Sequence, residues 1–197
     1  MSQNAGAGAD RKAIAASHLP GDSDVWVFVL GDMLIFSAYF GAYMFDRGRN
    51  QELFLHSQRQ LSPGLGAANT LVLLASSLFV ALCVQAARRG ERGAASRCLI
   101  LGGACGAGFV LIKLCEWYLK LSTGVGIATN SFFMHYYVLT GVHCFHVLLG
   151  LGILCLVWRE LHGAQPPRMR ILEIGATYWH MVDLLWILIF ALLYLMR

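Results

Sequence analysis

Long apolar runs alternate with short polar segments along this chain, and the length of the runs matches the thickness of a membrane. A helix that crosses the hydrocarbon core of a bilayer needs about 20 mostly apolar residues. The ten-residue segments of alternating polarity that are typical of a membrane β-barrel do not occur. The pattern therefore predicts an all-α fold, an integral membrane bundle of five transmembrane helices. The expected spans are Val25 to Phe45, Gly66 to Ala87, Cys98 to Leu121, Phe132 to Trp158 and Ile174 to Met196.

The amino-acid composition agrees with this class, because 57% of the residues are hydrophobic and only 13% are charged. Soluble domains carry about 25% charged residues. The first 24 residues are rich in Ala, Gly, Ser and Asp and lack the apolar core of a cleavable signal peptide. We therefore expect residues 1–24 to form a flexible cytoplasmic tail and residues 25–197 to form one transmembrane domain.

Positive charge is distributed unevenly between the two ends of the predicted spans, with nine Lys and Arg residues on the N-terminal side and five on the other. Because cytoplasmic loops carry the excess of Lys and Arg, we expect the N-terminus in the cytoplasm and the C-terminus outside, in a multi-pass protein of a bacterial inner membrane. The net charge of +4 has this origin and does not indicate nucleic-acid binding, since the basic residues are spread over short loops. The nine basic residues on the N-terminal side are Arg11, Lys12, Arg88, Arg89, Arg92, Arg97, Arg159, Arg168 and Arg170. The five on the other side are Arg47, Arg49, Arg59, Lys120 and Arg197.

The last apolar segment contains three ionisable residues, Glu173, His180 and Asp183. Such side chains cost about 2.5 to 3.5 kcal/mol each for Asp, Lys or Arg at membrane depth, so they usually face protein. Residues three apart share a helix face, and we therefore expect His180 to be hydrogen-bonded to Asp183. Glu173 lies two turns earlier on roughly the same stripe.

The same spacing recurs on the preceding helices. Lys113 and Glu116 are three apart and can neutralise each other near the outer end of the third helix. His143 and His146 share a face of the fourth helix by the same rule, whereas Asp32 stands alone on the first. We expect this polar set to meet inside the bundle or on a surface that faces a partner.

Small and hydroxylated residues indicate close contacts between the helices. Asn69, Thr70, Ser76 and Ser77 offer interhelical hydrogen bonds from the second helix. The six cysteines show no Cys-x-x-Cys pair and are interpreted as packing residues, without a zinc site or a disulfide framework. Glycines that permit close backbone approach on the third and fourth helices are Gly102, Gly103, Gly106, Gly108, Gly141, Gly150 and Gly152.

Two kinds of metal site compete as interpretations of the polar residues. His135, His143, His146 and His180 are candidate axial ligands of a haem, although two histidines three apart on one helix do not form the usual transmembrane pair across one iron. A di-iron carboxylate centre of the bundle type requires two Glu-x-x-His motifs, and this chain contains none. A stand-alone haem b protein therefore stays open as an alternative.

A small proton or ion transporter is a further alternative, with Asp32, Glu116, Glu173 and Asp183 as a relay. Five helices without an inverted repeat, and without a pair of broken spans, argue against a complete carrier. The same groups also suit a satisfied polar network that holds the helices in register.

Four motifs follow one another along the last four predicted helices. They are Asn69-Thr70-Leu71-Val72-Leu73-Leu74-Ala75-Ser76-Ser77, Gly106-x-x-Phe109-x-x-x-Lys113-x-x-Glu116-Trp117, His143-Cys-Phe-His146-Val-Leu-Leu-Gly150, and Glu173 followed by Tyr178-Trp179-His180-Met-Val-Asp183-Leu-Leu-Trp186. In this order they resemble the signature of subunit III of the haem-copper oxidases, over about Trp26 to Tyr194. Four ordered motifs are far more specific than any one of them.

The resemblance implies a non-catalytic subunit without its own redox centre. Members of the family bind no haem or metal directly; they pack against the catalytic haem-bearing subunit, retain structural phospholipid, and support assembly, proton delivery and stability during turnover. If the roles known in the family apply here, none of the matching polar residues is a catalytic residue, a cofactor ligand or a metal ligand. The internal polar network would consist of Asp32, Glu116, His143, His146, Glu173, His180 and Asp183. Helix pairing and anchoring would fall to Asn69, Thr70, Lys113, Tyr178, Trp179 and Trp186.

The chain departs from the family pattern at three places. Gly31-Asp32 stands where the family often has Ser-Glu, Lys113 replaces a usual Gln, and two further N-terminal helices of the longest members, which form one wall of their lipid cleft, are missing. Three features look more like the accessory branch that accompanies nitric oxide reductase than like the core oxidase subunit. They are the Gly31-Asp32-Met33 variant, the five-helix length and the segment Asn130-Ser131-Phe132-Phe133-Met134. The partner is therefore expected to reduce nitric oxide or oxygen.

Overall fold

The structure is a computed structural model that describes residues 23–196, and it is all-helical there. Five of its helices are long and apolar enough to cross a membrane, which confirms the predicted fold class. The predicted tail lies outside the described residues except for its last two positions, which belong to the first helix. The elements are α2 (Ser23–Arg49), α3 (Gln51–Gln58), α4 (Pro63–Arg88), α5 (Arg92–Ser122), α6 (Ser131–Leu161), α7 (Met169–Phe190) and the π-helical turn η2 (Ala191–Leu195).

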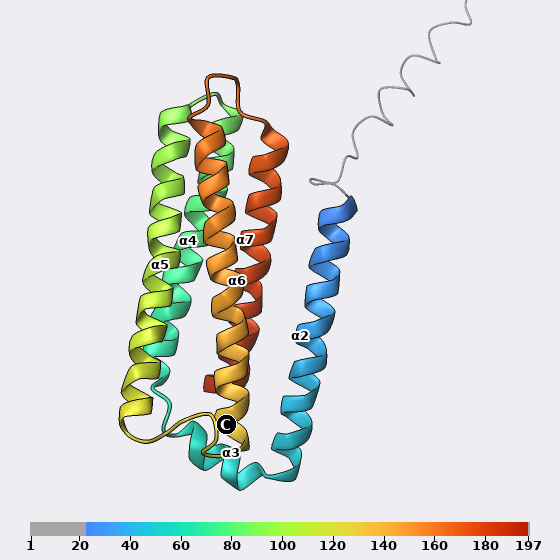
Figure 1. Cartoon of the computed structure of the whole chain (residues 1–197), viewed down its shortest axis with the longest axis vertical. Coiled ribbons are helices and arrows are strands. Elements are labelled where there is room, and N and C mark those ends of the chain that lie inside the picture. The colour runs from blue at the N-terminus through green and yellow to red at the C-terminus, as the bar shows by residue number, and fades with distance from the viewer. Residues whose placement is uncertain (1–22, 197) are drawn as a thin grey trace, which may run out of the picture.

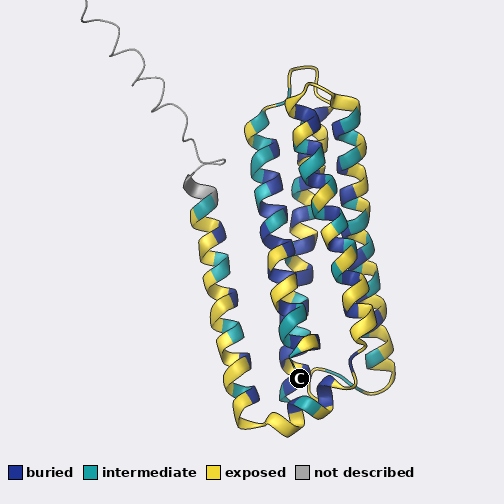
Figure 2. Ribbon diagram, turned by 180° about the vertical axis from the view of Figure 1, so that it is seen from behind, coloured by how far each residue is buried: buried dark blue, intermediate teal, exposed yellow. Residues whose placement is uncertain are grey.

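The four helices α4, α5, α6 and α7 form an up-and-down bundle, and α2 stands to one side of it (Figure 1). Helix α2 packs mainly against α6 and α7, and α3 crosses the end of the bundle beside η2. Figure 2 shows that most of α2 is exposed, whereas the inner faces of the bundle are buried. Short connections account for the antiparallel neighbours, since helices joined by a few residues must fold back on each other.

The helices extend beyond the predicted apolar runs because polar residues continue the same backbone hydrogen bonds. Helix α5 begins at Arg92, six residues before the expected span, and Gly90 supplies the left-handed conformation of the preceding turn at φ 80°. Helix α6 begins where expected, and the side chain of Asn130 caps it by accepting a hydrogen bond of 2.9 Å from the backbone N–H of Phe133.

The centre of the bundle is built around Trp179, which is fully buried. A Cβ atom at Gly106 would lie 2.6 Å from its ring, and one at Gly150 would lie 2.8 Å from it. Glycines on two helices therefore make the space that the indole from α7 occupies. The ring nitrogen donates a hydrogen bond of 3.1 Å to the hydroxyl of Ser76, so the buried donor is satisfied.

Tyr178, Trp179 and Trp186, expected to serve helix pairing and anchoring, lie between helices and not on the outer surface of the bundle. Trp179 and Trp186 are 0% exposed and Tyr178 is 4% exposed. Trp186 packs edge-to-face on Phe109, with ring centroids 4.7 Å apart. The sequence shows the bulky rings but not the gaps on other helices that receive them, and these residues anchor helix to helix instead.

Helix α3 is the element that the hydrophobic pattern did not predict, because eight residues are too few for a span. Its Phe54 is fully buried against Tyr43 and Phe132. Its Gln58 donates hydrogen bonds to the carbonyl oxygens of Leu193 at 2.9 Å and Leu192 at 3.3 Å. Helix α3 therefore caps the carbonyl groups that the end of the last span leaves without intrahelical partners.

Candidate functional site

A buried charge cluster joins α5 and α6 to the C-terminal turn η2. The ammonium group of Lys113 donates to Glu116 at 2.9 Å, to the hydroxyl of Tyr194 at 2.8 Å and to the hydroxyl of Tyr136 at 3.4 Å. Tyr194 in turn donates to the other oxygen of Glu116 at 2.8 Å. The predicted ion pair between Lys113 and Glu116 therefore forms, and side chains from distant segments complete it. The ring of Trp186 lies 5.0 Å from the Lys113 ammonium, so its face adds a cation–π contact.

A second ionic contact joins α2 to α6. The Oδ1 atom of Asp32 lies 3.1 Å from Nε2 of His146, and both side chains are about nine-tenths buried. The other ring nitrogen of His146 lies 2.8 Å from the carbonyl oxygen of Val142, which fixes the ring. Asp32, which has no paired residue on its own helix, meets a partner from a helix more than a hundred residues away, as expected for a polar set that meets inside the bundle.

His143 and His146 point to different neighbours despite their spacing. Three residues correspond to 300° of helix rotation, so the two side chains diverge by about 60°. His143 is fully buried, with its ring 5.5 Å from that of Phe109 and 5.2 Å from that of Trp186. Neither of its ring nitrogens has a hydrogen-bond partner among the described residues. The two histidines therefore do not act as one pair.

The predicted hydrogen bond between His180 and Asp183 does not form. Nδ1 of His180 lies 2.6 Å from the hydroxyl of Ser77 on α4 and 4.0 Å from Asp183. Asp183 is buried, and its oxygens make no hydrogen bond of acceptable geometry with residues 23–196. Glu173 lies on the same face of α7 as His180, as expected, and it pairs with Arg88 of α4 at 2.8 Å. Helix α4 supplies both contacts, which spacing along α7 alone could not reveal.

The hydroxyl groups of α4 form the expected interhelical hydrogen bonds. Thr70 accepts one of 3.0 Å from the ring nitrogen of Trp186. Ser76 donates one of 2.6 Å to the carbonyl oxygen of Gly102. Asn69 is fully buried, but its amide atoms have no partner in the part of the chain that the structure describes. The predicted pairing role is thus visible for Thr70 and not for Asn69.

The C-terminal end of α2 makes contacts that the sequence analysis missed. The Oδ2 atom of Asp46 lies 2.8 Å from Nε2 of His135. The hydroxyl of Tyr43 donates a hydrogen bond of 3.2 Å to the carbonyl oxygen of Leu192. A charged residue directly after an apolar span was the available signal, because a carboxylate at that depth needs a partner. Nothing in the sequence indicated that His135 would supply it.

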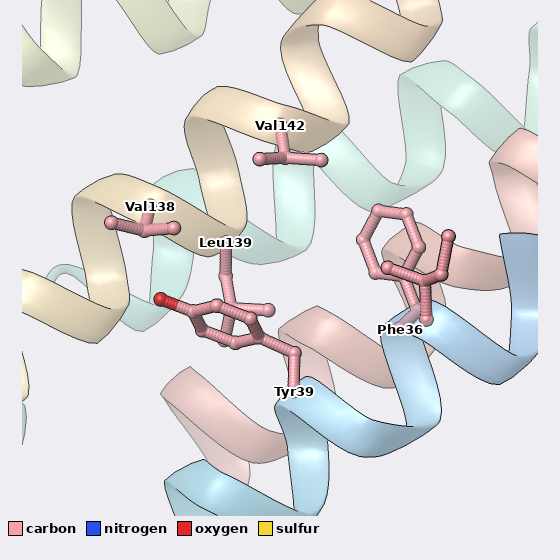
Figure 3. Close-up of a pocket in the computed structure, with 6 residues that line it drawn as sticks. Phe36, Tyr39, Val138, Leu139 and Val142 are labelled. Carbon is pink, nitrogen blue, oxygen red and sulfur yellow. The ribbon is translucent and has the colours of Figure 1, made fainter.

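A small cavity lies between α2 and α6, one turn along from the Asp32–His146 contact (Figure 3). Its volume is about 70 Å³, and Phe36 and Tyr39 of α2 face Val138, Leu139 and Val142 of α6 across it. The walls are apolar, so the cavity offers no ligand for a metal and no group for acid–base chemistry. It shows that the side chains of α2 and α6 leave a gap at this level.

The histidines considered as haem ligands are separated in the structure. His135 contacts Asp46, His146 contacts Asp32, His180 contacts Ser77, and His143 lies between aromatic rings. Within residues 23–196 no three His, Cys, Asp or Glu side chains come together in a way that could hold a metal ion. What the arrangement can do chemically is hold charge and hydrogen bonds between helices.

Comparison with known proteins gives this architecture a family. The model of the family described as cytochrome c oxidase subunit III matches residues 20–197. Cytochrome c oxidase subunit 3 of Thermostichus vulcanus is 29% identical over 192 residues, covering 93% of this chain and 94% of that protein. Quinol oxidase subunit 3 of Bacillus subtilis is 29% identical over 175 residues, covering 87% of this chain and 84% of that protein.

A third relative is a longer chain. Heme-copper oxidase subunit I+III of Aeropyrum pernix is 29% identical over 213 residues, which cover 94% of this chain but 25% of that protein. The matched region therefore corresponds to one part of a protein whose name joins two subunits. Since the family match includes all five spanning helices and the residues of each polar contact described above, this chain belongs to the cytochrome c oxidase subunit III family.

Proposed function

We propose that this chain is a non-catalytic membrane subunit of a respiratory haem-copper reductase complex and packs against the haem-bearing catalytic subunit. The single observation that carries this proposal is the family match over residues 20–197, which spans the whole bundle. The Aeropyrum pernix relative supports the partnership, because its name places subunits I and III in one polypeptide. Electron transfer and reduction of the acceptor belong to the partner, and this chain supports assembly, proton delivery and stability during turnover.

The side-chain contacts suit a supporting role. Asp32 is paired with His146, Glu116 with Lys113, and Glu173 with Arg88. These three carboxylates are thus held by a neighbour on another helix or one turn away, and they do not converge on an open reaction site. Haem and metal are expected in the partner subunit, with no cofactor bound directly by this chain.

Orientation and lipid binding are part of the proposal. The excess of Lys and Arg favours a cytoplasmic N-terminus and an external C-terminus in a bacterial inner membrane. Helix α2 exposes large apolar side chains along its length, among them Val27, Leu30 and Leu34. Structural phospholipid that lies beside α2 would cover these side chains and support the weakly packed helix.

A nitric oxide reductase is the more specific partner that we favour. The supporting observation is the Gly31-Asp32 pair where the family often has Ser-Glu, combined with the five-helix length. The carboxylate that is one methylene shorter still reaches His146 at 3.1 Å. Oxygen is the acceptor in the alternative, since the relatives described above are named as oxidase subunits.

Purification of the tagged chain from its own membranes in mild detergent tests the proposal. The chain should bring a haem-bearing polypeptide with it, and mass spectrometry of that polypeptide together with consumption of oxygen or nitric oxide identifies the acceptor. Purified away from that partner, the chain should be colourless. A haem absorption band in the isolated chain, or ion transport by the chain reconstituted alone, would contradict the proposal.

The variant Asp32→Asn tests the role in turnover. Because an amide can keep a hydrogen bond to His146, the complex should assemble normally. We expect the partner to lose activity faster over repeated cycles, as measured by acceptor consumption over time. Unchanged activity over many cycles would remove any proton-related role for this carboxylate.

A further inference from the structure

One ionisable side chain at membrane depth is much more exposed than its counterparts. The side chain of His180 is 42% exposed. Its Nδ1 atom is held by Ser77, and its Nε2 atom makes no hydrogen bond with a described residue. The exposed fraction is 12% or less for the side chains of Asp32, Lys113, Glu116, His146 and Asp183.

The position of His180 along α7 makes this exposure unfavourable in lipid. The span Met169–Leu195 is centred on Val182, and His180 lies two residues from that centre, which corresponds to about 3 Å at 1.5 Å per residue. The hydrocarbon core of a bilayer is about 30 Å thick, so His180 lies near its middle. An imidazole with a free ring nitrogen has no hydrogen-bond partner among acyl chains, and polar groups at this depth face protein or water.

The surface around His180 is hollowed and lined by small residues. A groove of about 220 Å³ runs between α4 and α7 beside the histidine. Small side chains let a neighbouring transmembrane helix approach closely. The small residues of the groove are Ala81, Ala176 and Thr177, and its polar residues are His180, Arg88 and Glu173.

The other outward faces of the bundle suit lipid instead, and even the larger groove between α5 and α6, about 480 Å³, has an apolar lining that includes Leu99 and Leu151. Helix α5 exposes Ile100, Leu101 and Leu111, and α6 exposes Phe145 and Leu148. Such side chains need no partner beyond acyl chains, because lipid tails are as apolar as they are. The α4–α7 face, defined by the groove residues above with Ser77, Leu74 and Leu184, is therefore distinguished by polarity at mid-membrane depth.

We propose that the α4–α7 face docks against a transmembrane helix of the catalytic subunit, which offers a hydrogen-bonding side chain to His180 near the bilayer midplane. The partner's identity rests on the proposed function, whereas the face is derived from exposure and depth. Docking covers the free ring nitrogen, fills the groove, and leaves the apolar faces of α5 and α6 to lipid.

Site-specific photocrosslinking within the native complex tests the face. A photoreactive phenylalanine analogue placed at Leu74 or Leu184 should crosslink to the catalytic chain. The same analogue at Leu101 of α5 or Leu148 of α6, which are similarly exposed, should crosslink to lipid only. Crosslinks to the catalytic chain from Leu101 or Leu148 alone, or crosslinks from Leu74 and Leu184 only to lipid or to a second copy of this chain, would overturn the inference.

A pair of matched substitutions supplies a second measurement. Ala81→Trp fills the groove, whereas Ala107→Trp places the same ring on the exposed side of α5. We expect Ala81→Trp to weaken association with the catalytic subunit about tenfold, which equals about 1.4 kcal/mol, and Ala107→Trp to leave it unchanged. Equal retention of the partner by both variants would contradict the inference, provided that each remains monodisperse in detergent.

The two proposals fail in different ways. If no haem-bearing chain copurifies with the unmodified protein, the proposed function is rejected, and the partner named here is rejected with it. If such a chain copurifies but crosslinks from α5 or α6, only the assignment of the α4–α7 face is wrong.

Discussion

Helices α2 and α7 have nearly the same mean hydropathy, yet they are packed in different ways. In the most apolar 18-residue window of each span, 17% of the residues are buried in α2 and 56% in α7. Figure 2 shows the same contrast, with α2 largely exposed beside a bundle whose inner faces are buried. Apolar character therefore makes a segment suited to the membrane without determining how much protein surrounds it, because lipid and protein interiors are similarly apolar.

The two regions also use different means of attachment. In the bundle, Trp179 fills a space between glycines of α5 and α6, so shape complementarity holds the helices together. Helix α2 is attached by separate polar contacts, Asp32 with His146 near one end and Asp46 with His135 near the other. Loss of one contact should therefore affect α2 locally, whereas a change in the bundle should affect the whole fold.

The largest expected effect comes from the charge cluster inside the bundle. Lys113→Met leaves Glu116 buried without its cation and should lower the free energy of unfolding by about 3 to 5 kcal/mol. Thermal unfolding in detergent measures the loss. The double variant Lys113→Met with Glu116→Leu removes both charges and should recover most of it. Equal stability of the single variant and the unmodified protein would show that the ion pair does not stabilise the bundle.

Overpacking at the centre of the bundle should have the next largest effect. Gly106→Ala places a methyl group 2.6 Å from the ring of Trp179 and should cost about 2 to 3 kcal/mol. Gly103→Ala is the matched control, because nothing lies within 4 Å of its added Cβ atom. The two variants should differ clearly in unfolding temperature, and similar temperatures would argue against the tight contact.

A local effect is expected when α2 loses one polar contact. Asp32→Ala leaves His146 without its partner, which costs about 1 to 2 kcal/mol. Hydrogen exchange should increase along α2 and remain unchanged in α4–α7. Ser37→Ala on the same helix removes a hydroxyl that donates only to the backbone carbonyl of Met33. This variant should leave the hydrogen exchange of α2 unchanged. Faster exchange throughout the bundle after Asp32→Ala would mean that the two regions unfold together.

The smallest effect is expected at the end of the bundle that α3 caps. Gln58→Ala removes the donors to Leu192 and Leu193 and should cost about 1 kcal/mol. Hydrogen exchange in η2 should rise, while Gln51→Ala, an exposed glutamine on the same short helix, should cause no change. If both variants behave alike, the cap does not stabilise the C-terminal turn.

The sequence was most informative where a pattern depends on length or local spacing. The five spans follow from apolar length, and the Lys113–Glu116 pair follows from one helix turn. It was least informative about partners from other helices. His180 is hydrogen-bonded to Ser77 and not to Asp183. Glu173 pairs with Arg88 of α4 and not with a residue of its own helix. Helix α3 was missed because it is too short for a span and because its contacts come from other segments, Phe132 of α6 and Leu193 of η2.

The sequence by itself determined the membrane class, the number of spanning helices and the family signature, since hydrocarbon length and short-range helix geometry are encoded locally. Tertiary structure alone decided that Trp179 and Trp186 are core residues, that Asp32 meets His146, and that His180 keeps a free nitrogen on an outer face. These outcomes depend on which helices become neighbours and how each is rotated. Rotation about the helix axis is set by packing between side chains, which no single segment specifies.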